Sequence, residues 1–479
     1  MEVKVGASLA RATPQVNERT PLHVLLVGNF CGTGHEADRA HPKPVLVDRD
    51  NLYELPAQLG VRLDGLLAST AGERQSIEFR EFEDFEPDQL FERLEIFEHL
   101  RTLRRRLQNP KHFDAAAAEV LLWQEEKAPS PIAAVTAEMP DAPSENLLDD
   151  ILSASPEAAQ SPLETGDWDR FIQGVVGESA IQRVDPKQDE LVALVDEAIA
   201  ATMRNVLQGK KFRSLEMNWQ GLRFLTFRAE SHAKLKIYLL DMTEEQFRET
   251  LGTDDWASSV LTQTVTTPSQ TPGATPWGVV GCVFPLETAE ADLTIAARLG
   301  EIAQAAGATA LVEVRGDRAS WLSETTSAPD GWADLQTFPA MRHVAALWPR
   351  IQLRLPYGKR YRPTDTFQFE EITRPGGSQL AWGSPVWLGV TALAQAYNEA
   401  GWKLQPSSVH EFTDLPLYYD PALEGDAHPC GEYLLTDSEI GRLIDLGLSP
   451  LVSFKNQDRV QIRGLQSLQA RPLAGPWSG

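Results

Sequence analysis

The chain has 479 residues, a length that exceeds a single hydrophobic core and predicts two to four domains of ~100–200 residues each. Its 42% hydrophobic content and mean hydropathy of −0.28 are typical of a soluble globular protein, and no apolar run approaches the ~20 residues of a membrane span. The formal net charge of −24 would repel phosphate backbones, which disfavours nucleic-acid binding.

The chain carries three cysteines, Cys31, Cys282 and Cys430. This sparse, odd set argues against a disulfide framework and favours a reducing compartment. The start of the sequence places Glu2 after Met1 and has no long apolar core, so it lacks the layout of a secretory signal. We therefore expect a cytoplasmic protein that does not insert into a membrane.

Residues 1–21 predict an extended arm, because valines stand before Gly6 and prolines at positions 14 and 21 disfavour a helix. Such an arm could add as a strand to the sheet of a neighbouring molecule, with an ordinary frayed terminus as the alternative. The candidate strand-exchange residues are Glu2, Val3, Lys4 and Val5. The apolar run at residues 23–30, which meets a glycine at Gly28, predicts a buried strand that opens the first domain.

Residues 76–82 alternate between apolar and polar side chains, which predicts a second strand with Ile77 and Phe79 on one buried layer. Phe82 joins that layer if the strand ends or bulges after Arg80. The acidic segment 84–88 then predicts a helix start, since Pro87 suits a first turn and carboxylates favour the positive end of the helix dipole. Leucines and a phenylalanine follow at spacings of three and four and predict one amphipathic helix reaching Leu107.

The composition changes at residue 126, where the range 126–188 begins. Up to position 166 this range is rich in Ala, Pro, Ser and acidic residues. Repeated prolines there predict a flexible linker. One short amphipathic helix is expected inside it, over residues 146–152. That helix would present Leu147, Leu148, Ile151 and Leu152 together, as a helix that docks into a groove does.

The order of the next elements predicts a mixed α/β fold. A periodic apolar face from Asp189 to Leu207 predicts a long helix, and residues 235–240 and 277–284 predict buried strands. The segment 291–306 predicts a helix and 308–314 a strand, which completes a strand–helix–strand unit. The Gly- and Pro-bearing block 356–378 marks an expected subdomain boundary.

We therefore expect α/β (mixed α+β) architecture with two to three packed subdomains, an extended arm and a linker. The expected divisions are 1–21 (arm), 22–125 (first domain), 126–188 (linker), 189–365 (second domain, first part) and 366–479 (its C-terminal part).

No pattern in the chain anchors catalysis. The loop 28–35 follows a strand but lacks the lysine and the glycine spacing of a phosphate-binding loop, so we interpret it as a turn. Cys31 with His35, and His428 with Cys430, lack the spacing of a zinc site. We therefore assign no catalytic, cofactor-binding or metal residues, and an enzyme using the carboxylates between Glu81 and Asp88 is the disfavoured alternative.

Several tryptophans lie in apolar stretches, which predicts that they pack in the core, with burial in an interface as the alternative. They are Trp219, Trp348, Trp382, Trp387 and Trp402.

The segment Phe82-Glu83-Asp84-Phe85-Glu86-Pro87-Asp88, followed by a Leu- and Arg-rich stretch, resembles the small sheath subunit of type VI secretion systems (TssB, or VipA). Val47-Asp48-Arg49-Asp50-Asn51 and the strand before it resemble the same family in the same order. This resemblance covers roughly residues 1–125.

The remainder of the chain resembles the large sheath subunit (TssC, or VipB). The blocks that carry the resemblance are Leu215 to Leu222, Leu353 to Gly358, Trp382-Gly383, and the run from Leu434 to Asp458. The chain is thus similar to a fusion of two subunits that are normally separate. The motif residues are Asp84, Phe85, Glu86, Pro87, Leu355, Pro356, Tyr357, Gly358, Trp382, Gly383, Lys455, Asn456 and Asp458.

The resemblance implies a non-catalytic protomer without cofactors. Such protomers form a helical homopolymer around an inner tube of Hcp and attach to baseplate proteins. Contraction of the polymer then drives the tube outward. It also implies the ATPase ClpV as a partner, for which the expected helix 146–152 is the candidate site. A baseplate or assembly adaptor that has a sheath-like fold but does not polymerise is the alternative.

Overall fold

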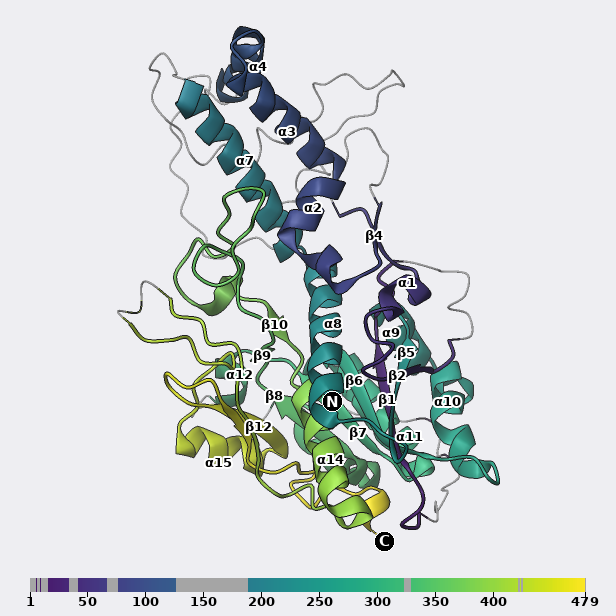
Figure 1. Cartoon of the computed structure of the whole chain (residues 1–479). Coiled ribbons are helices and arrows are strands. Elements are labelled where there is room, and N and C mark those ends of the chain that lie inside the picture. Colours follow the sequence, from purple (N-terminus) through teal and green to yellow (C-terminus); the bar gives the residue numbers. More distant parts are fainter. Residues whose placement is uncertain are drawn as a thin grey trace.

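A nine-stranded sheet with helices on both faces organises the computed structural model, which describes residues 6, 9, 16–33, 42–66, 76–125, 188–322, 329–420, 423 and 425–478 (Figure 1). The expected mixed α/β class is confirmed. No helix among these residues is long and apolar enough to cross a membrane.

The main sheet is parallel in its centre and antiparallel at both ends. Its strands, in spatial order, are β11 (His410–Phe412), β13 (Val460–Ile462), β12 (Leu448–Ser453), β8 (Val344–Trp348), β7 (Thr309–Val314), β6 (Trp277–Leu286), β1 (Leu22–Gly28), β5 (Leu235–Asp241) and β2 (Val45–Val47). All neighbours from β12 to β5 run parallel, whereas β13, β11 and β2 pair antiparallel. Two small antiparallel sheets pair β3 (Val61–Asp64) with β4 (Ser76–Phe79) and β9 (Ile351–Gln352) with β10 (Trp382–Gly383).

The helices fall into a group around the sheet and a group that protrudes from it (Figure 1). Around the sheet lie α8 (Lys210–Ala229), α9 (Glu244–Gly252), α10 (Val260–Gln270), α11 (Glu290–Ala306), α14 (Val386–Ala400) and α15 (Asp437–Asp445). The protruding group is α3 (Glu95–Gln108), α4 (Phe113–Glu125) and α7 (Gln188–Gln208), with α2 (Pro87–Arg93) at its base. Shorter helical segments are α1 (Leu55–Leu59), α12 (Arg318–Leu322), α13 (Trp332–Thr337), η2 (Phe82–Phe85), η3 (Trp256–Ser258), η4 (Pro339–His343), η5 (Gly377–Gln379), η6 (Gly401–Lys403) and η8 (Pro476–Ser478).

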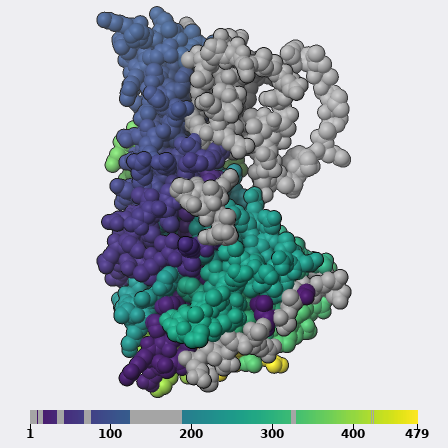
Figure 2. Space-filling model, turned by 90° about the vertical axis from the view of Figure 1, so that its right-hand side faces the viewer, coloured from purple at the N-terminus to yellow at the C-terminus, as the bar shows by residue number. Residues whose placement is uncertain are grey.

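Strand β1 comes from the N-terminal part of the chain but lies inside the sheet, between β5 and β6. Its residues alternate between two cores, with Val24 and Leu26 facing α8 and α14, and Leu25 and Val27 facing the side of α9 to α11. Because both faces are covered, the strand is apolar almost throughout. In the space-filling view, residues before position 125 and residues after 188 adjoin over one continuous surface (Figure 2).

The predicted strand–helix–strand unit is confirmed as β6, α11 and β7. Strands β6 and β7 are parallel, and α11 ends at Gly307, whose φ of 66° lies in the left-handed region that favours glycine. The predicted strand at 235–240 and the predicted helix from Asp189 are confirmed as β5 and α7.

The prediction of one continuous helix up to Leu107 was wrong. Leu94 has an extended backbone (φ −83°, ψ 128°) and separates α2 from α3. Its carbonyl accepts the amides of Phe97 and Glu98, so it begins α3 while its own side chain remains buried. The leucine spacing continues across this break and does not indicate it, because both helices bury their apolar faces in the same core.

Four of the five tryptophans expected in cores are buried, namely Trp219, Trp348, Trp382 and Trp387. Trp402 is partly buried and packs against the core that contains Trp219 and Trp387. The expected domain divisions stay predictions. Strands β1 and β2 of the 22–125 range and four strands of the 189–365 range, β5 to β8, nevertheless belong to one sheet.

Candidate functional site

The loop that follows β1 is a closed turn. The amides of Phe30 and Cys31 donate to the Asp241 carboxylate at 2.6 and 2.8 Å, and the Gly32 amide donates to the side chain of Asn29. The Asp241 carboxylate thus accepts the amide hydrogen bonds that a bound phosphate would need. This geometry supports the interpretation of the loop as a turn.

The cysteines lie where thiol chemistry is suppressed. All three are buried and none of them forms a disulfide, and burial raises the pKa of the Cys282 and Cys430 thiols to about 12. The Cys430 thiol donates to the Pro416 carbonyl at 3.2 Å. Among the described residues, no group of three or more His, Cys, Asp or Glu is placed to hold a metal ion.

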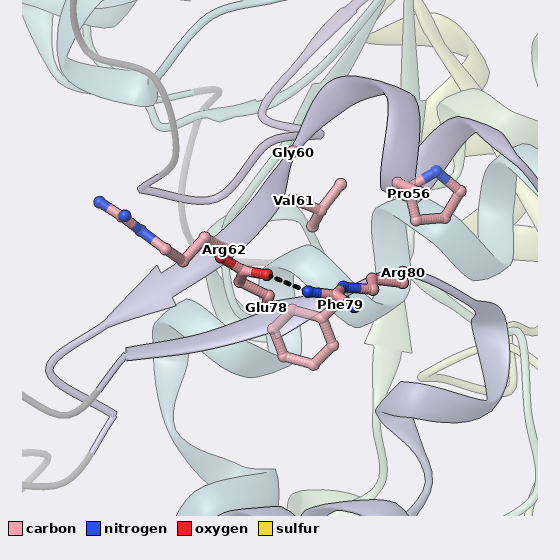
Figure 3. Close-up of a pocket in the computed structure, with 8 residues that line it drawn as sticks. Pro56, Gly60, Val61, Arg62, Glu78, Phe79 and Arg80 are labelled. Carbon is pink, nitrogen blue, oxygen red and sulfur yellow. Dashed lines mark hydrogen bonds and ion pairs between the residues drawn. The ribbon is translucent and has the colours of Figure 1, made fainter.

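A cavity of about 170 Å³ lies between α1 and the β3–β4 pair (Figure 3). Two arginines line it, and a carboxylate neutralises each: Arg62 pairs with Asp64 at 3.1 Å and Arg80 with Glu78 at 3.0 Å. The Arg80 and Glu78 side chains are exposed, so water screens this pair. The cavity thus offers neither an activated nucleophile nor an unbalanced charge, and we assign it no ligand.

The motif at residues 82–88 builds the start of α2. Phe85 is buried and stacks on Phe79 at a centroid distance of 4.3 Å. The Asp84 carboxylate accepts the amides of Arg80 and Glu81 and pairs with Arg93 at 2.6 Å. Pro87 occupies the first turn of the helix, as predicted.

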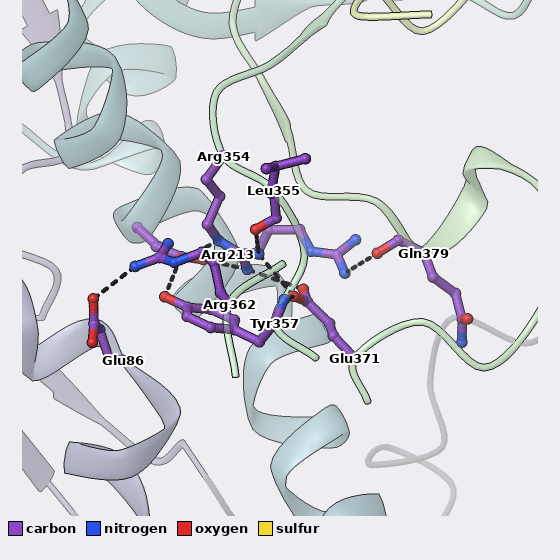
Figure 4. A network of polar contacts seen from close by, with 9 residues as sticks. Glu86, Arg213, Arg354, Leu355, Tyr357, Arg362, Glu371 and Gln379 are labelled. Carbon is purple, nitrogen blue, oxygen red and sulfur yellow. Dashed lines mark hydrogen bonds and ion pairs between the residues drawn. The ribbon is translucent and has the colours of Figure 1, made fainter. Parts of the chain in front are cut away.

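A buried ion network surrounds Arg354, next to the motif at 355–358 (Figure 4). The guanidinium donates twice to Glu216 on α8, at 2.5 and 3.1 Å, and twice to Glu371, at 2.7 and 3.0 Å. The side chain of Arg354 is 3% exposed and those of both glutamates 0%, so the three charges are removed from water together. The two carboxylates raise the pKa of Arg354 well above its ordinary value, although burial acts in the opposite direction.

Tyr357 closes this network. Its amide donates to Glu371 at 2.9 Å, and its ring lies against the guanidinium of Arg354 at 4.4 Å and that of Arg362 at 4.5 Å. Burial, followed by the charge of Glu216, raises the pKa of the Tyr357 hydroxyl far above its ordinary range. The hydroxyl is therefore kept neutral, and the network is suited to holding segments together rather than to proton transfer.

The motifs of the two halves of the chain meet at this network. Arg362 pairs with Glu86 at 2.6 Å (Figure 4). The Asp88 carboxylate accepts the amide of Thr366 at 2.9 Å. The segment 82–88 thus docks on the loop that follows the 355–358 motif. We call this contact the junction; it consists of Glu86, Asp88, Arg362 and residues 365–366.

The other motif residues lie away from the junction and serve local structure. Trp382 donates to the Gly377 carbonyl at 3.0 Å, and a Cβ at Gly383 would lie 2.3 Å from the Leu353 side chain. Lys455 pairs with Asp426 at 2.6 Å, and Asn456, at a φ of 56°, accepts the Ala427 amide. The Asp458 carbonyl accepts the Leu415 amide, and the Leu355 carbonyl accepts from Arg354. These contacts fix turns.

Two sets of candidate residues lie outside the described part of the chain. They are the strand-exchange residues Glu2, Val3, Lys4 and Val5, and the ClpV candidates Leu147, Leu148, Ile151 and Leu152. Both assignments stay predictions.

Sequence reasoning missed the centre of the network. Glu216 stands between Leu215 and Met217, and Arg354 between two leucines, in blocks that were singled out for their resemblance alone. A lone charge in an apolar run signals a buried ion pair, because a buried charge is costly unless it is paired. The partner Glu371 has no such signal in the sequence around it.

Comparisons with known proteins agree with these motifs. Residues 189–469 match the family model VipB, described as EvpB/VC_A0108, tail sheath N-terminal domain. Residues 6–119 match the model described as type VI secretion system, VipA, VC_A0107 or Hcp2. The chain is 25% identical over 305 residues to the type VI secretion system sheath protein TssC1 of Pseudomonas aeruginosa, an alignment that covers 59% of this chain.

The aligned part covers 61% of TssC1, so the chain spans about three fifths of the length of this curated relative. The VipB model alone matches more than half of the chain, and the VipA model matches the segment ahead of it. The chain therefore belongs to the VipB tail sheath family of type VI secretion systems, with a VipA-like and a VipB-like segment fused in one polypeptide.

Proposed function

We propose that the chain is a structural protomer of the contractile type VI sheath, which polymerises around an inner tube of Hcp and contracts to propel it. The observation that supports this most directly is the position of β1 between β5 and β6. The VipA-like segment supplies a central strand to the sheet of the VipB-like segment, so the fusion is one folded unit carrying both sheath components. A sheath works by repacking such units against each other and needs no catalytic residue.

Contacts between protomers would involve strand addition by the N-terminal arm. Within the described residues the main sheet ends at β2 and β11, which are three residues long each. An added strand from residues 2–5 of a neighbour would use backbone hydrogen bonds, which require little side-chain specificity. This contact, together with Hcp and baseplate proteins as partners and a cytoplasmic location, belongs to the proposal.

Electron cryo-microscopy of the full chain, expressed alone and with Hcp, tests the proposal. We expect helical tubes, with density that joins adjacent protomers through residues 2–5. Discrete monomers or small rings under every condition would reject the sheath function and favour the adaptor.

The proposal also includes ClpV as the ATPase that disassembles the sheath, with residues 146–152 as its docking helix. Deletion of these residues should abolish retention of the chain on immobilised ClpV. A deletion of equal length at residues 129–135 is the control and should retain binding. Undiminished binding after the first deletion would contradict this assignment.

A further inference from the structure

Helices α7 and α8 follow each other directly but are two helices. The single residue between them, Gly209, has φ −56° and ψ 129°, a backbone conformation that interrupts the helical hydrogen bonding. A Cβ at this position would lie 3.2 Å from the Val206 carbonyl oxygen and 3.3 Å from that of Asn205. Glycine therefore fits this break better than a residue with a side chain does.

The break lies where the protruding helices join the body (Figure 1). On one side, α7 packs along α3, and Arg104 of α3 pairs with Asp196 of α7 at 2.5 Å. On the other side, α8 packs on α14 and on the sheet. Gly209 thus separates two sets of helices, each with its own internal contacts.

The loop 356–379, which we call the brace, contacts both sides of the break. On the body side, Glu371 of the brace shares Arg354 with Glu216 of α8, and Arg213 of α8 donates to the Gln379 carbonyl at 3.2 Å. The residues that bind the brace here, Arg213, Glu216 and Arg354, all follow Gly209 in the chain and belong to the body.

On the protruding side, Arg204 of α7 donates to the Glu370 carbonyl at 3.1 Å. Asp88 of α2 accepts the Thr366 amide, and Phe91 stacks on Phe367 at 4.6 Å. One loop therefore contacts helices on both sides of the break.

The two ends of the brace differ in burial. The Arg354 side chain and its two glutamates are nearly removed from water, so breaking them apart would leave uncompensated buried charges. Arg362 and Glu86 remain 30% and 43% exposed, and water can replace their contact at little cost. Apolar side chains at the break, such as Leu207 and Phe212, are buried but their contacts are non-directional. The ion pair between the brace and the protrusion is thus more exposed to water than the network that anchors the brace on the body, although Phe91 of the protruding side is buried.

We propose that α3, α4 and α7, with α2 at their base, form a lever that turns at Gly209, and that the brace holds its angle until the contacts of Glu86, Asp88 and Arg204 are exchanged. This device does not depend on the proposed sheath function, because it rests on contacts within one protomer. In an assembly it would allow the protrusion to change direction while the sheet stays intact.

Distances between spin labels in the full chain test this inference. Leu122→Cys on α4 and Val409→Cys beside β11 are suitable label sites, because these side chains are 56% and 59% exposed. The three native cysteines are buried and should not react. We expect one narrow distance distribution in the labelled parent.

Adding Asp88→Ala and Arg204→Ala should at least double the width of that distribution. Adding Gly209→Ala alone should shift its mean, since alanine favours a continuous helix over a break. The control is Arg318→Gln, which removes a partly exposed ion pair between α12 and Glu439 of α15, outside the lever and the brace, and it should change neither width nor mean.

Unchanged distances in both the Asp88/Arg204 and the Gly209 variants would overturn the lever, as would equal broadening in the control. If circular dichroism shows that the double variant is not folded, Asp88→Asn replaces it. This substitution keeps the size of the side chain and should still broaden the distribution measurably.

Discussion

Arg354 is the residue on which the buried ion network depends most. Replacement by methionine would leave Glu216 and Glu371 buried without a counter-charge, and such a loss costs about 3–5 kcal/mol of unfolding free energy. We expect urea unfolding to show this loss. The triple variant R354M/E216Q/E371Q should recover most of it, because its buried groups carry no net charge.

The matched control is Arg459→Gln. It removes an arginine–carboxylate pair with Glu411 whose side chains are about one third exposed, and it should cost about 0–1 kcal/mol. A loss in R354M no larger than in this control would contradict the assigned role of the network.

The buried thiols predict a dependence of stability on pH. Burial raises the pKa of Cys282 and Cys430 to about 12 from an ordinary value of 9.0, so both stay protonated in the folded state after the unfolded state has released its protons. The unfolding free energy should therefore fall as the pH rises from about 9 toward 12. Urea midpoints measured across pH 8–10.5 should fall less steeply in the variant C282A/C430A. Equal slopes in the two proteins would exclude the thiols as the cause.

At the scale of single residues, the sequence predicted the features that depend only on neighbouring residues in the chain. The helix start at Pro87 and the burial of Ile77, Phe79 and Phe82 follow from spacing alone, and the structure confirms them. The junction could not be predicted in this way. Glu86 and Arg362 stand 276 positions apart, and nothing in either neighbourhood identifies the other.

At the scale of elements, the N-terminal arm allows a prediction about assembly. Proline lacks the amide that a sheet ladder needs, and residues 2 and 4 direct their amides to the opposite edge from residues 3 and 5. One of the pairs V3P/V5P and E2P/K4P should abolish the tubes seen in electron micrographs while leaving thermal unfolding of the protomer unchanged.

Val3→Thr with Val5→Thr is the control for this experiment, since threonine keeps the amide and suits a strand. Tubes of normal length in both proline variants would show that the arm does not form the contact.

Helix and strand identities were accessible from periodicity, but the interruption at Leu94 was not. Leu94 ends a helix inside an apolar pattern that continues on both sides. Tertiary packing determines this break, because the apolar positions on either side face the same core.

At the scale of the whole molecule, the topology predicts that the linker is not needed to hold the halves together. Cleavage at a protease site inserted within residues 126–187 should leave both fragments in one gel-filtration peak, since β1 is bonded on both sides by strands of the other fragment. Under denaturing conditions the fragments should separate. Separation without denaturant would contradict this prediction.

The fold class was predictable because strands and helices alternate in the sequence, as in other α/β proteins. The order of strands was not predictable. Hydrophobic patterns identify β1 as a buried strand but carry no information on which strands become its neighbours, and only a long-range pairing places it in the centre of the sheet.

The central position of β1 has a consequence for biosynthesis. The Asp241 carboxylate that binds the turn after β1 stands 211 positions after Phe30. At ~5–20 residues per second, a ribosome needs roughly ten to forty seconds to deliver it. During this interval the apolar residues of β1 are without the neighbours that cover them. The fusion ensures that those neighbours emerge on the same nascent chain, at a fixed one-to-one ratio and a high effective concentration, so that β1 never depends on finding a separate polypeptide.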